Sequence, residues 1–189
     1  MLCKKLHHAA YRCVDARATV DFYTQVLGLK FSHAMGEDHV PSTGAYSPHI
    51  HIFFEMEDGS CIAFFECPND PGDVKDRTSP DWIQHFAFQV ESTDVLMAAK
   101  TRFETLGLEV VGPTDHDGFI TSIYFFDPSG HRLELTTNTC APERLKEFEA
   151  EAPNVLALWE QTHDWSQREK LFGAKTGYAR NRASNESTR

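Results

Sequence analysis

The chain contains two stretches of similar pattern, and this internal repeat limits its fold more than any other feature of the sequence. Residues 6–11 (LHHAAY) match residues 83–88 (IQHFAF), so that His85 lies 77 residues after its counterpart His8. A second pair of landmarks repeats the spacing, since Gly107 of the LGL stretch at 106–108 lies 79 residues after Gly28 of the LGL stretch at 27–29. A nearly constant offset between two pairs of motifs indicates a duplicated structural unit.

The first copy is expected to contain a strand, a helix and three further strands. The pattern predicts a strand over 5–13, a helix over 16–27 with Asp15 as N-cap and Gly28 as stop, a strand over 30–35, a loop over 36–48, and strands over 49–56 and 60–67. Asp58-Gly59 between the last two strands is a typical hairpin turn. The order is therefore βαβββ.

The second copy repeats this order. We expect a strand over 83–90, a helix over 93–106, a strand over 109–111, a loop through Pro113, a strand over 120–126, a turn over 128–130 and a strand over 131–136. The predicted fold class is α+β, with two paired βαβββ modules that form an open, cup-shaped mixed sheet. The polar faces of the strands would line the inside of the cup.

The predicted domain covers residues 1–140, with module one at 5–67, a linker rich in proline and charge at 68–81, and module two at 82–137. Helix-forming residues dominate the extension at 141–173, where Pro153 is expected to separate two short helices. These helices would pack on the outside of the cup or on another subunit. The polar stretch at 174–189 is expected to be disordered.

The composition argues against several classes of function. A net charge of −10 without a basic stripe opposes binding to nucleic acid, which requires neutralisation of phosphates. No apolar segment is long enough to cross a membrane, and the start MLCKK lacks the apolar block of a signal peptide, so a cytoplasmic location is expected. The five cysteines have no CxxC spacing and are expected to be reduced.

Three residues form a candidate metal site. In the strand at 83–90, His85 alternates with Phe86, and in the last strand Glu134 alternates with Leu133, so both point away from the apolar face. His8 occupies the position of His85 in the first copy. Two histidines and one carboxylate suit a divalent metal with open positions, as in non-haem Fe(II) sites. In the alternative, the histidines are ordinary polar residues that line the cup and Glu134 pairs with Arg132 or Arg12.

Tyr124 and His116 are candidate catalytic residues. Tyr124 shares a strand face with Ser122 and is expected to face the cup, and His116 lies in a loop from which it would act as an acid or base. A packing tyrosine and a solvated loop histidine are the alternatives.

Three further residues are possible ligands by type. His49 and His51 share a strand face and are interpreted as packing or surface residues. Glu66 is a candidate fourth ligand, but counting from the turns at Gly59 and Gly130 places Ala63 opposite Glu134 in the repeat. The site is therefore expected to be asymmetric, with a carboxylate ligand from the second copy only.

These motifs together resemble the vicinal oxygen chelate superfamily, which includes glyoxalase I, the bleomycin and fosfomycin resistance proteins and the extradiol dioxygenases. The resemblance covers about residues 5–137 and rests on His8 before Asp15, Phe22-Tyr23 before the first LGL, His85, and the stretch SIYFFDPSG at 122–130 before Glu134. It implies paired βαβββ modules, a small-molecule substrate, and a divalent metal held by His8, His85 and Glu134. Members often form dimers, so a homodimer is a further expectation.

Within the superfamily, His116 and Tyr124 look most similar to the His and Tyr beside the metal in extradiol dioxygenases. The resemblance therefore implies Fe(II), with Mn, Zn or Ni as alternatives, and cleavage of a catechol-like ring by dioxygen. One departure is that the catalytic histidine of those enzymes is replaced by Gly59-Ser60-Cys61. A glyoxalase-type lyase or isomerase, or a metal-free small-molecule binding or resistance protein, are the alternatives.

Overall fold

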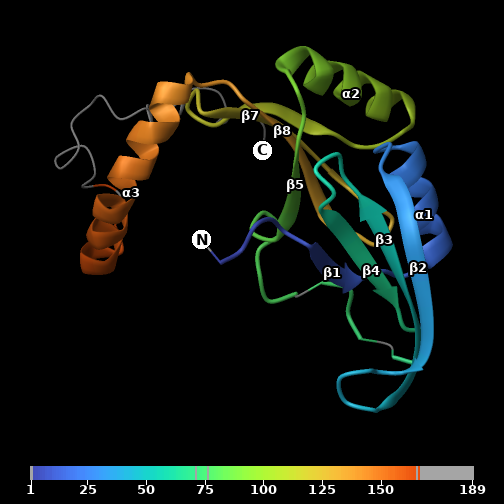
Figure 1. Ribbon diagram of the computed structural model, residues 1–189. Coiled ribbons are helices and arrows are strands. Elements are labelled where there is room, and N and C mark those ends of the chain that lie inside the picture. The colour runs from blue at the N-terminus through green and yellow to red at the C-terminus, as the bar shows by residue number, and fades with distance from the viewer. Residues whose placement is uncertain (1, 71, 76, 165, 167–189) are drawn as a thin grey trace. The chain divides into compact units, whose positions relative to one another are not determined.

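The computed structural model describes residues 2–70, 72–75, 77–164 and 166 (Figure 1). Its elements are β1 (His8–Arg12), α1 (Ala16–Gln25), β2 (Lys30–His39), β3 (Tyr46–Glu55), β4 (Cys61–Glu66), β5 (His85–Gln89), α2 (Thr93–Thr105), β6 (Val111–Asp115), β7 (Ile120–Phe126), β8 (Arg132–Asn138) and α3 (Pro142–Thr162). The strands form two four-stranded sheets, ordered β1-β4-β3-β2 and β5-β8-β7-β6. Because the two orders are equivalent, the predicted α+β fold with two βαβββ modules is confirmed.

The chain divides into two compact units. The first contains the described parts of 1–87, 103–109 and 124–134, and the second those of 88–102, 110–123 and 135–189. The first unit therefore holds all of the first module together with His85, Tyr124 and Glu134, whereas His116 belongs to the second unit. The domain boundaries expected from the sequence stay a prediction.

In the first unit, α1 packs on one face of the sheet β1-β4-β3-β2. β1 runs parallel to β4, and the pairs β3–β4 and β2–β3 are antiparallel. The fully buried ring of Tyr23 on α1 stacks on Phe54, with ring centroids 5.0 Å apart, and lies 4.9 Å from Phe64. Burying side chains of this size contributes about 1.5–3 kcal/mol each, so this cluster is a main source of the unit's stability.

The start of α1 is fixed as the sequence predicts. The side chain of Asp15 accepts a hydrogen bond from the backbone N–H of Ala18 at 2.8 Å. After the helix, Gly28 has a φ of 75°, which is in the left-handed region that glycine adopts without strain. Asp15 as N-cap and Gly28 as stop signal therefore both have a structural basis.

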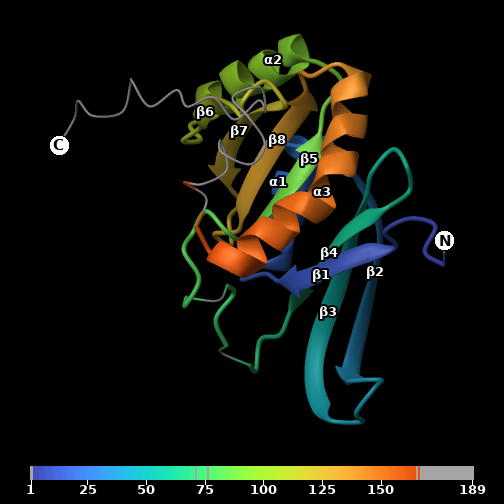
Figure 2. The ribbon, with the colours of Figure 1, turned by 90° about the vertical axis from the view of Figure 1, so that its left-hand side faces the viewer.

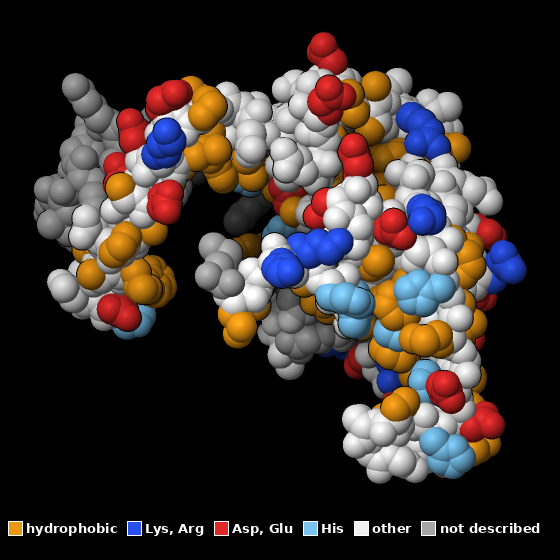
Figure 3. Space-filling model, viewed as in Figure 1, with side chains coloured by type: hydrophobic (Ala, Val, Ile, Leu, Met, Phe, Trp, Pro, Cys, Tyr) orange, Lys and Arg blue, Asp and Glu red, His pale blue; other side chains and the backbone are white. Residues whose placement is uncertain are grey.

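The other face of this sheet carries histidines and aromatic rings. Because side chains alternate along a strand, His51 and Phe53 of β3 point away from the face that carries Phe54. His51 pairs with Phe65 of β4 in the register, and His33 pairs with Phe53. Figure 3 shows histidines among hydrophobic side chains over this part of the molecule. We call His8, His33, His51, Phe53 and Phe65 the aromatic–histidine face.

The turn between β7 and β8 is anchored inside the first unit. Asp127 is buried and accepts hydrogen bonds from the Tyr23 hydroxyl at 3.1 Å and from the backbone N–H groups of Ser129 and His131. Burial raises the pKa of this carboxyl. The Nε2 atom of His131 donates to the carbonyl oxygen of Arg12 at 2.7 Å. These bonds fix the start of β8, the strand that carries Glu134.

The prediction of a loop over 36–48 is largely wrong, because β2 continues to His39 and β3 begins at Tyr46. The ladder includes the pairs Gly36↔Ile50 and His39↔Tyr46, with a register shift between residues 37 and 39. Backbone pairing holds these strands together without a hydrophobic pattern. Pro48 lies in β3 close to this irregularity, where a missing N–H donor is tolerated.

Two other expectations about proline were also wrong. The expected loop through Pro113 is part of β6 (Val111–Asp115), which is an edge strand of its sheet and so accommodates a residue without an N–H group. The two short helices expected after residue 141 are one helix, α3 (Figure 2). Pro153 lies inside this helix. A proline removes a single intrahelical hydrogen bond, and the helix continues past it because helix-forming residues lie on both sides.

In the second unit, α3 contacts the loop after β6. Phe148 of α3 meets Phe119 edge-on, with ring centroids 5.2 Å apart, and the guanidinium of Arg144 lies 4.2 Å above the Phe148 ring. Leu156 and Trp159 on α3 are exposed. The tail expected at 174–189, and the end of the extension expected at 141–173, lie outside the described residues. Within the described residues, the structure contains no helix that could span a membrane, and all five cysteines are free thiols.

Candidate metal centre

His85 and Glu134 lie next to each other on neighbouring strands. His85 begins β5 and Glu134 lies in β8, and these strands are adjacent in their sheet. The Nε2 atom of His85 is 2.9 Å from a carboxylate oxygen of Glu134. The Glu134 side chain is 4% exposed and that of His85 is 31% exposed. The structure therefore brings two of the three expected ligands together, with one member open to solvent.

The ring of His85 is held through its other nitrogen. Its Nδ1 atom is 3.1 Å from the carbonyl oxygen of Ile83. A carbonyl oxygen only accepts hydrogen bonds, so this contact requires a proton on Nδ1. Nε2 donates to the Glu134 carboxylate when it carries a proton, and it offers a lone pair to a metal ion once that proton is displaced. A backbone carbonyl holds metal-binding histidines in the same way. His85 and Glu134 thus fit two ligand positions of a divalent metal.

Tyr124 and Arg132 lie beside this pair. The ring of Tyr124 meets that of His85 edge-on, with centroids 6.2 Å apart, and the guanidinium carbon of Arg132 lies 4.2 Å from the centre of the Tyr124 ring. Arg12, a partner considered for Glu134, forms its ion pair with Asp70 at 2.7 Å. Tyr124 is therefore within the surroundings of His85, as a catalytic role would require.

His8, the third expected ligand, lies in a different group of side chains. Its Nδ1 atom is 2.8 Å from Nδ1 of His7, and its ring lies 5.9 Å from that of His51 and 5.4 Å from that of Phe53. Among the residues that the structure describes, no three His, Cys, Asp or Glu side chains are arranged to hold a metal ion. The role of His8 as a ligand stays a prediction.

His51 has a more distinctive environment than the sequence suggested. It is 8% exposed and its ring stacks on Phe65, with centroids 3.7 Å apart. Burial lowers the pKa of His51 to about 4, so the imidazole is neutral at pH 7. Its Nε2 atom is buried and has no hydrogen-bond partner among the described residues. The signal in the sequence was its position on a strand face with His49, but a strand pattern does not show how deeply the ring is buried.

The first module adds no carboxylate to the His85–Glu134 pair. Glu66 accepts a hydrogen bond at 2.6 Å from the backbone N–H of Ala16, at the start of α1. Ala63 is fully buried and pairs with Ala10 of β1. The first module therefore has a small apolar residue where the second module has Glu134.

His116 lies directly after β6 in the second unit. Its backbone N–H donates to the carbonyl of Ile120, and its own carbonyl accepts from the N–H of Phe119, which closes a tight loop. The side chain is half-buried. A catalytic role for His116 stays a prediction.

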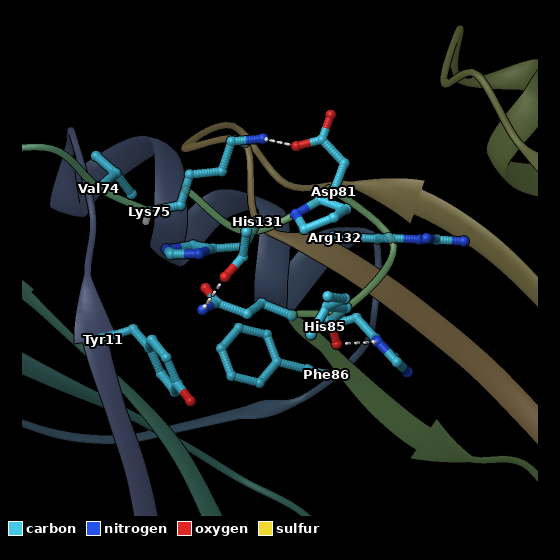
Figure 4. A pocket seen from close by; sticks show the side chains of 13 residues that line it. Tyr11, Val74, Lys75, Asp81, His85, Phe86, His131 and Arg132 are labelled. Carbon is cyan, nitrogen blue, oxygen red and sulfur yellow. Dashed lines mark hydrogen bonds and ion pairs between the residues drawn. The ribbon is translucent and has the colours of Figure 1, made fainter. Parts of the chain in front are cut away.

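A cavity of about 270 Å³ opens beside His85 in the first unit (Figure 4). Tyr11 of β1, linker residues between 74 and 81, residues 83–86 and residues 130–132 line it. Tyr11 and Phe86 meet edge-on in one wall, with ring centroids 4.6 Å apart. Sequence reasoning did not find this cavity, because it depends on where the linker lies over β1 and β5.

Residues 5–135 match the sequence profile of the Glyoxalase/Bleomycin resistance protein/Dioxygenase superfamily. The chain belongs to this superfamily, which is the vicinal oxygen chelate group that its motifs resemble. The glyoxalase family protein from Enterococcus faecalis has the same fold, with a TM-score of 0.53 and 24% identity over 72% of this chain and 99% of that one.

Two curated relatives represent different chemistries. The metallothiol transferase FosB of Bacillus licheniformis is 26% identical over 151 residues, which cover 79% of this chain and 85% of FosB. The putative ring-cleaving dioxygenase MhqA of Bacillus subtilis is 28% identical over 136 residues, which cover 70% of this chain but only 40% of MhqA. The chain thus spans most of FosB and less than half of MhqA.

Proposed function

We propose that this protein is a divalent-metal-dependent enzyme that binds two adjacent oxygens of a small substrate. The observation that carries the proposal is the 2.9 Å contact between Nε2 of His85 and the carboxylate of Glu134. Membership of the superfamily supports metal dependence. His85, Glu134 and His8 would hold the ion, and a divalent ion bound there would acidify a substrate hydroxyl and polarise its oxygen.

The first candidate reaction is ring cleavage of a catechol-like compound by dioxygen, with Fe(II) as the metal and Mn, Zn or Ni as alternatives. The similarity to MhqA supports this reaction. The aromatic–histidine face, where His33 stacks on Phe53 with centroids 4.1 Å apart, suits a planar substrate. Tyr124 would donate a hydrogen bond to substrate oxygen, and His116 would exchange a proton as acid or base.

The second candidate reaction is transfer of a thiol. It is favoured by the similarity to FosB, a metallothiol transferase, which extends over 85% of that protein. The missing histidine at Gly59-Ser60-Cys61 also weakens ring cleavage relative to a reaction that does not need that acid. Both candidate reactions would use the same two metal ligands, so metal binding cannot distinguish between them. The metal site and the reaction therefore need separate experiments.

Metal content tests the site. Protein purified without oxygen and loaded with Fe(II) or Mn(II) should hold about one ion per chain by elemental analysis, and His85→Ala or Glu134→Ala should reduce this to background. His39→Ala is the matched control, since His39 is an exposed histidine of β2 that contacts Tyr46. A His85→Ala variant that keeps its full metal content would overturn the proposal, and wild-type protein that takes up no metal would favour a metal-free binding protein.

Substrate consumption tests the reaction. Dioxygen uptake with a panel of catechols is expected for ring cleavage, and loss of free thiol with an electrophilic co-substrate is expected for thiol transfer. Redox-neutral conversion of a thiol adduct would instead identify a glyoxalase-type lyase or isomerase. Light scattering tests the homodimer that the exposed Leu156 and Trp159 of α3 suggest.

A further inference from the structure

We propose that the cavity beside His85 binds the anionic group of a small organic substrate and that Arg132 is the residue that holds this group. The inference deepens the proposed function and rests on it for the link to catalysis, because His85 lines the same cavity. Binding of an anion in the cavity does not itself require the metal. The two proposals therefore fail in different experiments.

The size and walls of the cavity favour a small ligand with an apolar body. Its volume of about 270 Å³ lies just below the range of roughly 300–1,000 Å³ that is typical for drug-sized ligands. Tyr11 and Phe86 form an aromatic wall, and Pro80 and Ile83 add apolar surface. In Figure 4 the rings of Tyr11 and Phe86 lie side by side below the cluster of charged groups.

The charges in the cavity favour an anion. Lys75 and Asp81 both line it and neutralise each other through an ion pair of 2.8 Å. The hydrogen bond from Lys75 lowers the pKa of Asp81, and Arg132 is a smaller influence in the same direction. Arg132 itself has no carboxylate within ion-pair distance among the residues that the structure describes. The cavity therefore keeps one uncompensated positive charge, in a chain whose net charge is −10.

The guanidinium of Arg132 is held in place for this role. It stacks on Tyr124 at 4.2 Å, which uses one face of its plane. The N–H donors of a guanidinium lie in that plane, and they match the oxygens of a carboxylate or phosphonate in paired hydrogen bonds. Arg132 also lies two residues before Glu134 on the same strand, hence on the same strand face. His85 lines the same cavity as Arg132.

Calorimetric binding to the metal-free full chain tests the proposal with three ring compounds of similar size. Benzoate and phenylphosphonate should bind, and neutral benzamide should bind at least tenfold more weakly. Arg132→Gln should weaken both anions about 10–100-fold, which is the usual contribution of a charged hydrogen bond, and leave benzamide unchanged. Arg132→Lys should retain part of the affinity. Comparing the two anions shows whether carboxylate or phosphonate is preferred.

Arg17→Gln is the matched control, because Arg17 is an exposed arginine of α1 that lies outside the cavity. Equal binding of the anions by wild type and Arg132→Gln, with both proteins folded by circular dichroism, would overturn the proposal. So would equal losses in Arg17→Gln and Arg132→Gln, or benzamide binding as tight as benzoate. If Arg132→Gln does not fold, Arg132→Lys decides: unchanged anion affinity and unchanged preference over benzamide would also overturn it. Anion binding through Arg132 in a protein that never retains metal would refute only the proposed function.

Discussion

Glu134 is a buried carboxylate, and His85 is one of its side-chain partners in the metal-free protein. The Glu134 side chain is only 4% exposed, and His85 approaches it to 2.9 Å. Removing one member of a buried ion pair costs about 3–5 kcal/mol, because the other charge is left without a partner. The cost should be lower here, about 1–3 kcal/mol, since His85 is 31% exposed and water screens the contact. The pair is thus a stability element as well as a candidate metal site.

A double-mutant cycle tests this statement. His85→Ala should lower the free energy of unfolding in EDTA by about 1–3 kcal/mol, and adding Glu134→Gln should restore about 1 kcal/mol by removing a charge from a buried position. Urea unfolding of the two single variants and the double variant measures the coupling. Strictly additive effects would show that the two residues do not interact in solution.

His51 gives the first unit a dependence on pH. Its folded-state pKa of about 4 lies below the usual 6.5, so between these values the unfolded chain binds more protons than the folded one. The free energy of unfolding should therefore rise with pH across this window and fall on acidification, by about 1–3 kcal/mol. His8, His49 and His33 surround the ring and add repulsion when it is charged.

The variant His51→Gln should flatten this pH dependence, because glutamine does not titrate. The measurement is urea unfolding of metal-free protein between pH 4 and 7, with His39→Gln as an exposed control. If His51→Gln and wild type keep the same slope, the acid sensitivity comes from other groups, and the buried position of the His51 ring does not control it.

At the scale of elements, the side chain of Asp15 caps the start of α1, where Glu66 also accepts the N–H of Ala16. Asp15 accepts the N–H of Ala18 at 2.8 Å, and replacing such a cap by alanine costs about 0.5–2 kcal/mol. Asp15→Ala should lower the free energy of unfolding by about 1 kcal/mol, and Asp15→Asn, which keeps the acceptor oxygen, should cost much less. Denaturant unfolding compares the two variants. An equal loss in both would assign the effect to the lost charge near the helix start.

The sequence predicted those elements that follow local rules. The helix cap at Asp15, the stop at Gly28 and the strand that begins with His85 all arise from residues close together in the chain. The errors at residues 36–48, at Pro113 and at Pro153 share one cause: backbone pairing and helix continuity override the local tendency of glycine and proline to interrupt an element. Pairing between distant strands is not encoded in a local pattern.

The candidate site divides in the same way. Alternation along two strands was enough to point to His85 and Glu134, because the strands are neighbours in one sheet. The cavity beside His85 and the burial of His51 depend on how the linker and the aromatic side chains pack. Packing at that level requires the positions of distant residues, which a single sequence does not supply.

At the scale of the whole molecule, the two modules share a strand order but not a chemistry. The second module supplies the His85–Glu134 pair, whereas the first has Ala63 at the equivalent position and carries the aromatic–histidine face. Duplication thus gave one fold with two specialised halves. The second module holds the predicted ligands His85 and Glu134, and the first offers aromatic rings and the predicted third ligand, His8.

This division predicts that metal binding stabilises the folded chain. An ion that binds only the folded state adds about 2.7 kcal/mol to the free energy of unfolding when its free concentration is a hundred times its dissociation constant. For a protein of this size, that corresponds to a rise in melting temperature of about 5–10 °C, which chelation should reverse. His85→Ala should abolish the rise, and His8→Ala should reduce it in proportion to the contribution of the third ligand. A rise that is intact in His8→Ala but absent in His85→Ala would show that the second module binds the ion without the first.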